Sequence, residues 1–225
     1  RCSVVALQSG LQFCAWSCFT GRRWLYDSLN LQKATSNNKK NIELLKNMKK
    51  VLVISSSLRL RSNSEALADE FIRGAAEAGN EVEKITLKDK EIHFCKGCLN
   101  CQKTQKCVIK DDAPAIVEKM HDADVIAFAT PIYYYEMCGQ LKTLLDRANP
   151  LYPSDYRFRD IYMLTSAAEN EEYVPERAVA GLTGWIDCFE KARLAGTVFA
   201  GGVGGPGETE SHPALKQAYE MGKAV

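Results

Sequence analysis

Residues 49–65 read K-K-V-L-V-I-S-S-S-L-R-L-R-S-N-S-E, and this stretch decides the fold. Its first half is a β-branched, apolar run without alternation, which is typical of a strand buried on both faces. Its second half carries hydroxyl, amide and guanidinium groups and leads directly into the helical period of residues 63–79. A buried strand, a polar turn and a helix in this order predict the first unit of a parallel α/β sheet.

The same alternation continues to the end of the chain. Further strands are expected at residues 81–87, 124–130, 159–166 and 195–203, and further helices at residues 111–120, 139–148, 175–193 and 212–222. Charges interleave in the second strand, which places it at an edge of the sheet. The sequence therefore predicts a doubly wound, five-stranded parallel sheet with helices on both faces, and a ligand site at the carboxyl ends of the strands.

Composition predicts one globular domain at residues 48–225. The chain has 225 residues, 46% hydrophobic and 25% charged, which is enough for one sizeable core. Residues 1–47 carry a net charge of +5 and leave −4 for the rest. A mildly acidic body has no electrostatic footprint for nucleic acid.

Residues 1–47 show neither a clean helical period nor a strand period. Their apolar stretch is too short and too polar to span a bilayer, and it lacks the features of a secretory signal. We interpret residues 1–47 as an extension outside the fold, with the functional protein beginning at Met48. A divergent helical extension is the alternative.

The loop after the first strand has the composition of an anion site. Backbone N–H groups and the helix dipole at a helix N-terminus favour a phosphate. The side chains that can add donors there are Ser57, Arg59, Ser62, Asn63 and Ser64. The loop matches neither G-x-x-x-x-G-K-[ST] nor G-x-G-x-x-G, so it supports neither a nucleoside triphosphatase nor a dinucleotide fingerprint. A Ser/Asn capping loop without a ligand is the alternative.

Two more loops follow strands at the same edge of the predicted sheet. T-P-I-Y-Y-Y at residues 130–135 offers aromatic rings and backbone amides against which a flat ring can stack. The tyrosines could instead pack under the next helix. T-S-A-A at residues 165–168 has small side chains that let the backbone approach a ligand closely.

Four cysteines lie within thirteen residues, spaced C-x2-C-x2-C-x5-C at Cys95, Cys98, Cys101 and Cys107. Disulfides are disfavoured, because no export signal is recognisable and cytosolic thiols stay reduced. Zinc with four thiolates is possible, although structural zinc usually takes two separated C-x2-C pairs. The spacing suits three corners of a [4Fe–4S] cluster with Cys107 as the fourth ligand. Cys138 and Cys188, in predicted helices, are interpreted as buried small hydrophobes.

Together the three loops resemble the flavodoxin-like NAD(P)H-dependent FMN reductase family, and their layout resembles its iron–sulfur flavoproteins. The resemblance covers nearly all of residues 48–225, and P-I-Y followed by G-Q-L-K-x-x-L-D-R at residues 131–147 is its most specific part. The first loop departs from the commoner G-S-P-R-x-x-G-N-T form, because Ser56 and Ser62 take the glycine places.

The resemblance implies FMN with its phosphate in the first loop. The ring would lie between two walls, formed by Pro131, Ile132, Tyr133 and Tyr134 on one side and by Ser166, Ala167 and Ala168 on the other. The implied activity is a flavin oxidoreductase that passes electrons from NAD(P)H to a quinone, a nitro compound, a free flavin or a metal ion. No catalytic side chain is nominated, since hydride transfer to a flavin needs no protein acid or base.

The alternatives are an iron–sulfur electron carrier that exchanges single electrons with a ferredoxin, and a flavodoxin-shaped binding protein without flavin. The resemblance also implies that the cysteines either hold a cluster or form a cluster-free lid beside the flavin. A cytoplasmic homodimer or homotetramer, with no nucleic-acid or membrane partner, is expected.

Overall fold

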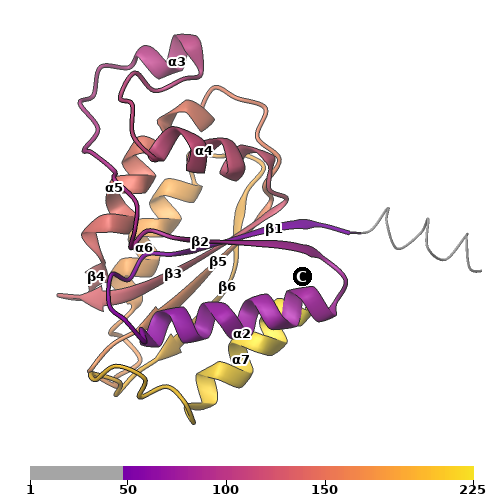
Figure 1. Ribbon diagram of the computed structural model, residues 1–225, viewed down its shortest axis with the longest axis vertical. Helices are drawn as coiled ribbons and strands as arrows, with labels where there is room; N and C mark the ends of the chain where they lie inside the picture. Colours follow the sequence, from indigo (N-terminus) through magenta and orange to yellow (C-terminus); the bar gives the residue numbers. More distant parts are fainter. Residues whose placement is uncertain (1–47) are drawn as a thin grey trace, which may run out of the picture. The chain divides into compact units, whose positions relative to one another are not determined.

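The computed structural model describes residues 48–225, so the expectation for residues 1–47 lies outside the described residues. Five parallel strands form the main sheet in the order β2-β1-β3-β5-β6 (Figure 1). Their bounds are β1 Lys50–Ser55, β2 Glu81–Thr86, β3 Val125–Tyr133, β5 Asp160–Ser166 and β6 Arg193–Ala200. This is the flavodoxin-like strand order, with β2 at an edge. The predicted fold class is confirmed.

Helices cover both faces of the sheet (Figure 1). One face packs against α2 and α7, and the other against α4, α5 and α6. Their bounds are α2 Asn63–Glu77, α4 Ala113–Asp122, α5 Gly139–Arg147, α6 Glu176–Ile186 and α7 Pro213–Lys223. No helix within residues 48–225 is both long and apolar enough to cross a membrane.

The core explains why β1 reads as a continuous apolar run. Val51 and Val53 point into the cluster under α2 and α7, whereas Leu52 and Ile54 point into the cluster under α4 to α6. Each of these four side chains is at most 2% exposed. Both faces of a central parallel strand are therefore apolar, as expected for a doubly wound sheet.

The end of β3 differs from the sequence prediction. Pro131 was expected to end the strand, but β3 continues to Tyr133 and turns back as the short antiparallel strand β4, Glu136–Met137. Proline is tolerated where a strand does not need its N–H. The pairing of Ile132 with Met137 then extends the strand beyond it.

Three helical elements also differ from the prediction. The cysteine segment contains an unpredicted short helix, α3 (Asn100–Thr104), and a 3-10 turn, η1 (Asn149–Leu151), follows α5. Helix α6 ends at Ile186 instead of continuing to residue 193. The backbone tightens there, because the N–H of Phe189 donates to the carbonyl of Ile186 at 2.8 Å, and the Phe189 ring joins the core.

Helices α2 and α7 approach each other through two glycines. A Cβ atom at Gly74 would overlap the carbonyl oxygen of Tyr219, and one at Gly222 would overlap the carbonyl oxygen of Phe71. The two helices can pack this closely only because neither position carries a side chain.

Gly74→Ala and Gly222→Ala should each lower the free energy of unfolding by roughly 1–3 kcal/mol, because an added methyl group forces the helices apart. Urea unfolding followed by far-UV circular dichroism measures this change. Gly184→Ala in α6 is the matched control, since no atom lies within 4 Å of the added Cβ. It should raise stability by about 0.5–1 kcal/mol. Equal effects at all three glycines would contradict the close helix contact.

Candidate cofactor site and cysteine cavity

A cavity of about 170 Å³ lies at the carboxyl ends of the parallel strands. Strand β1 has β2 on one side and β3 on the other, so the chain changes direction here, and such switch points hold ligands in open α/β sheets. Ten of the twelve predicted cofactor residues line the cavity: Ser57, Arg59, Ser62, Asn63, Pro131, Ile132, Tyr133, Ser166, Ala167 and Ala168. No acidic residue of the described chain lines it.

The serines of the β1–α2 loop are partly committed to holding the loop. Ser62 is the N-cap of α2, and its hydroxyl accepts from the N–H of Glu65 at 3.5 Å. Ser64 does not line the cavity; it is fully buried, with its hydroxyl 3.1 Å from that of Ser62. The hydroxyl of Ser55 is buried at the end of β1 without a hydrogen-bond partner in the described structure.

Asn63 braces a neighbouring loop. Its amide nitrogen donates to the carbonyl oxygens of Val203 at 3.1 Å and Gly205 at 2.8 Å. The guanidinium of Arg59 donates to Gly204 O at 2.7 Å. Both donors of the Asn63 amide are therefore occupied by the loop between β6 and α7.

This β6–α7 loop adds two lining residues, Val203 and Gly204, that the sequence did not reveal. Neither side chain carries a polar group. The glycine-rich run A-G-G-V-G-G at residues 200–205 was the one signal that could have found the loop.

The tyrosines occupy a strained hairpin turn. Tyr134 and Tyr135 have φ values of +50° and +65°, a left-handed conformation that bulky residues rarely adopt. Tyr133 is 51% exposed and lines the cavity, whereas Tyr134 is 97% exposed and does not. The two tyrosines predicted for the ring wall therefore differ in position.

A hydrogen bond joins the β3–β4 turn to the loop after β5. The hydroxyl of Tyr135 donates to Glu169 at 3.0 Å, and its ring stacks on Tyr173 with the ring centroids 6.2 Å apart. The hydrogen bond to the Glu169 carboxylate raises the pKa of Tyr135 above its ordinary value. The two walls of the cavity are thus tied together outside it.

A larger cavity, of about 470 Å³, lies under the cysteine loop, which we define as residues 94–110. All four motif cysteines line it, together with Arg147 and Asn149, with Trp185 in the last turn of α6 and with Phe189 just after that helix. Cys188 lines it too and is exposed, so its interpretation as a buried hydrophobe is wrong. It lies past the end of α6, where the chain turns at the surface. Cys138 is buried, as expected.

The four thiols share a cavity but do not converge. Within residues 48–225, no three His, Cys, Asp or Glu side chains are arranged so that they could hold a metal ion. Cys95 and Cys98 are exposed, and Cys101 is buried with the Asn149 amide donating to its sulfur at 3.2 Å. Four thiols are chemically suited to bind a metal, but in this structure they do not lie close enough together to bind one ion or cluster.

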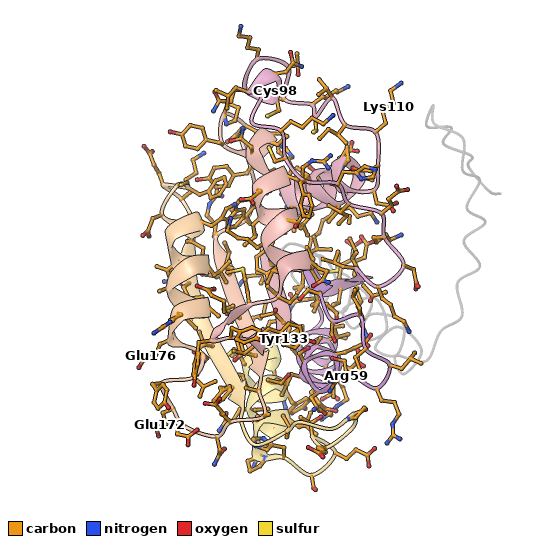
Figure 2. All side chains as sticks on the ribbon, turned by 90° about the vertical axis from the view of Figure 1, so that its left-hand side faces the viewer. Arg59, Cys98, Lys110, Tyr133, Glu172 and Glu176 are labelled. Atoms are coloured by element: carbon orange, nitrogen blue, oxygen red, sulfur yellow. The ribbon has the colours of Figure 1, made fainter. Side chains whose placement is uncertain are left out.

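The cysteine cavity is separated from the cavity at the sheet edge. The two share no lining residue. Figure 2 shows Cys98 and Tyr133 towards opposite ends of α5. The two cavities are therefore distinct within one chain, and the expectation that the loop forms a lid beside the flavin stays a prediction.

A buried ion pair, which the sequence analysis missed, lies beside the cysteines. Burial opposes the charge of Arg147, but hydrogen bonds with Asp111 and Cys107 outweigh it and raise its pKa. Burial likewise acts to raise the pKa of Asp111, yet hydrogen bonds from Arg147 and from the N–H groups of His93 and Ala113 bring it below the ordinary value. Both groups are therefore charged at neutral pH.

Sequence comparison supports an evolutionary relationship to flavoproteins. The sequence model of the family described as NADPH-dependent FMN reductase matches residues 49–171. An iron–sulfur flavoprotein of Methanocaldococcus jannaschii is 43% identical over 102 residues, which are 45% of this chain and 53% of that protein. An FMN-dependent NADH:quinone oxidoreductase of Bordetella bronchiseptica is 30% identical over 112 residues, 44% of this chain and 52% of that protein. The chain thus spans about half the length of these relatives.

Solved structures agree on the fold. An NAD(P)H:quinone oxidoreductase from Methanothermobacter marburgensis superposes with a TM-score of 0.59 at 18% identity, covering 78% of this chain and 98% of that one. An azoreductase from Bacillus anthracis gives a TM-score of 0.60 at 17% identity, covering 79% and 100%. At this identity the likeness establishes the fold alone.

Asn63→Ala should lower the free energy of unfolding by about 1–3 kcal/mol, because it leaves the carbonyl of Val203 without its buried donor. Arg61→Ala is the matched control, since it removes only an ion pair with Glu210 whose side chains are 71% and 76% exposed. Its effect should stay within about 0.5 kcal/mol. Urea unfolding of both variants compares them, and equal stabilities would show that Asn63 does not support the loop.

Proposed function

Because the chain belongs to the NADPH-dependent FMN reductase family, we propose that it is an FMN-dependent oxidoreductase that takes electrons from NAD(P)H. The observation that carries this proposal is the gathering of ten predicted cofactor residues, from three separate loops, around one cavity. The acceptor is a small molecule such as a quinone, a nitro compound, a free flavin or a metal ion.

The phosphate of FMN fits the N-terminus of α2. The helix has 15 residues, so its first N–H groups and its dipole offer a full anion-binding end. Ser57, Ser62 and Arg59 line the cavity at this end, and the unpartnered hydroxyl of Ser55 lies at the base of the same loop. Arg59 can donate to a phosphate while it also donates to Gly204.

The ring of the cofactor would lie at the mouth of the cavity, between the hairpin and the loop after β5. The cavity is smaller than the roughly 300–1,000 Å³ of a typical ligand pocket, so it suits the phosphate and its chain. The ring would extend over Tyr133, whose exposed side chain can stack on it. Ala167 and Ala168 let backbone groups reach the opposite edge of the ring.

Bound flavin supplies the redox chemistry, accepting a hydride from the nicotinamide and passing electrons onward. The residues of this chain bind and orient it. Because no acidic side chain lines the cavity, nothing there repels the phosphate. The side chain of Tyr135 ties the hairpin to Glu169 and so fixes the width of the ring site.

The proposed enzyme is a homodimer or homotetramer in the cytoplasm. Leu58, Leu60, Phe94 and Tyr134 are 48%, 71%, 79% and 97% exposed, and such apolar groups suit contact with another subunit. Exposed thiols such as Cys95 and Cys98 suit a reducing compartment.

Anaerobic stopped-flow mixing of the FMN-loaded chain with NADPH, and separately with NADH, tests the main proposal. With at least one of the two donors, the absorbance of oxidised flavin should decrease at a rate of about 1 s⁻¹ or faster, as expected for an enzyme. Bound flavin that stays oxidised with both donors would contradict a nicotinamide-dependent enzyme. A chain that takes up no FMN would contradict the flavoprotein assignment itself.

A second candidate function, an iron–sulfur flavoprotein that carries single electrons, is favoured by a separate observation. Cys95, Cys98, Cys101 and Cys107 line one cavity. Arg147 lines it as well, and its Nε is buried without a hydrogen-bond partner in the described chain. The charge of Arg147 is already paired with Asp111, but the free Nε–H could donate to a cluster sulfur, and such hydrogen bonds are known to tune clusters. Binding would require the exposed end of the loop to close over the cavity.

Iron and acid-labile sulfide should be measured on the anaerobically purified chain. The second candidate expects about four irons per chain, the stoichiometry of a [4Fe–4S] cluster. Cys107→Ser should lose this iron, whereas Cys188→Ser, a change at a cavity thiol outside the motif, should retain it. Iron at trace level in the unaltered protein would contradict this candidate and leave the flavin enzyme intact.

A further inference from the structure

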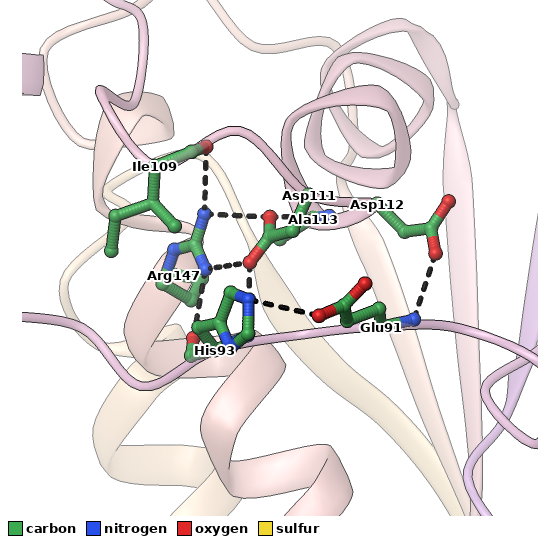
Figure 3. A network of polar contacts seen from close by, with 7 residues as sticks. All are labelled: Glu91, His93, Ile109, Asp111, Asp112, Ala113 and Arg147. Atoms are coloured by element: carbon green, nitrogen blue, oxygen red, sulfur yellow. Dashed lines mark hydrogen bonds and ion pairs between the residues drawn. The ribbon is translucent and has the colours of Figure 1, made fainter.

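The guanidinium of Arg147 connects the two ends of the cysteine loop by hydrogen bonds. Nη1 of Arg147 donates to the carbonyl of His93 at 2.7 Å and to Asp111 at 2.6 Å. Nη2 donates to Asp111 at 2.9 Å and to the carbonyl of Ile109 at 3.4 Å. Figure 3 shows these contacts, which join the residue before the loop, the end of the loop and the last turn of α5.

Asp111 completes the closure from the other side. Its carboxylate also accepts from the N–H of His93 at 2.9 Å and from the N–H of Ala113 at 3.1 Å. The side chains of Asp111 and Arg147 are both 0% exposed. One buried ion pair thus holds the segment that enters the cysteine loop against the segment that leaves it.

The rest of the loop has few anchors. Its one regular element in the described structure is α3, five residues long, flanked by Leu99 and Gln105 with left-handed φ values of +57° and +54°. Only two side-chain hydrogen bonds reach η1 and the residues after it, from Asn149 to Cys101 and from Gln105 to the carbonyl of Pro153. The thiols owe their placement largely to the base of the loop.

We propose that Asp111 and Arg147 are positioning residues for the cysteine loop: their ion pair keeps the loop folded over its cavity and keeps the Cys101 thiol covered. This inference rests on contacts within the protein and does not depend on what the cavity binds. It also assigns a role to the arginine that ends the G-Q-L-K-x-x-L-D-R motif, at the opposite end of α5 from the candidate flavin site.

Thiol alkylation resolved by peptide mass spectrometry tests the proposal on the full chain, after a chelator has removed any metal. Cys101 and Cys138 are 8% and 1% exposed, so both react only when the structure opens. Cys101 reports the loop, whereas Cys138 reports the start of α5 and the core. Arg147→Ala should speed alkylation of Cys101 by about ten-fold or more and leave Cys138 unchanged.

Two further variants sharpen the test. Arg147→Lys keeps the charge but cannot make the forked contacts, so Cys101 should react at an intermediate rate. Lys142→Ala removes an exposed ion pair with Asp146 on the same helix and should change neither thiol.

If Arg147→Ala unfolds the chain, both thiols will react together. The double variant Asp111→Leu with Arg147→Met then replaces the pair without leaving a buried charge unpaired. It should free Cys101 while Cys138 stays protected. Continued protection of Cys101 in either folded variant would overturn the proposal, as would joint exposure of both thiols in the double variant.

Discussion

The parallel pairing of β1 with β3 is the constraint on which the rest of the structure depends. It runs from Val51 opposite Val125 to Ser55 opposite Ala129. Just beyond it, both the N–H and the hydroxyl of Ser56 donate to the carbonyl of Ala129 at 2.9 Å. The β1–α2 loop therefore begins beside Ala129, while β3 runs on past this point into the β3–β4 hairpin. The polar groups of the loop and Tyr133 of the hairpin line the same cavity at the switch point of the sheet.

Helix α5 connects the hairpin at the sheet edge to the base of the cysteine loop. It begins at Gly139, directly after the hairpin, and ends at Arg147, under the cysteine loop. Its nine residues span roughly 13 Å at 1.5 Å per residue. The candidate flavin site and the cysteine cavity thus lie towards opposite ends of one helix, as Figure 2 shows for Tyr133 and Cys98.

The sequence predicted the fold class and most of the candidate site, because both depend on local signals. Apolar runs marked the strands, and polar or aromatic residues marked the loops that follow β1, β3 and β5. Val203 and Gly204 escaped prediction because they contribute backbone and shape instead of polar side chains. Asn63 carried the right chemistry, but its partners lie about 140 residues away in the chain, where no local pattern could reveal them.

The cysteine loop shows more clearly that local sequence patterns do not reveal contacts between distant parts of the chain. Its spacing identified four candidate ligands, but not their distance from the sheet edge or the buried pair at the base of the loop. Asp111 accepts from the N–H of Ala113, the first residue of α4, which is a local contact next to the helix start. Its larger role follows from a partner on α5, 36 residues away.

Titration of the flavin-free chain with FMN and, in parallel, with riboflavin tests the central claim that the β1–α2 loop holds a phosphate beside a stacked ring. Quenching of flavin fluorescence would report binding. Hydrogen bonds to a charged group contribute about 1.5–3 kcal/mol, so FMN should bind at least roughly ten-fold more tightly than riboflavin. Equal affinities would contradict a phosphate site at the N-terminus of α2.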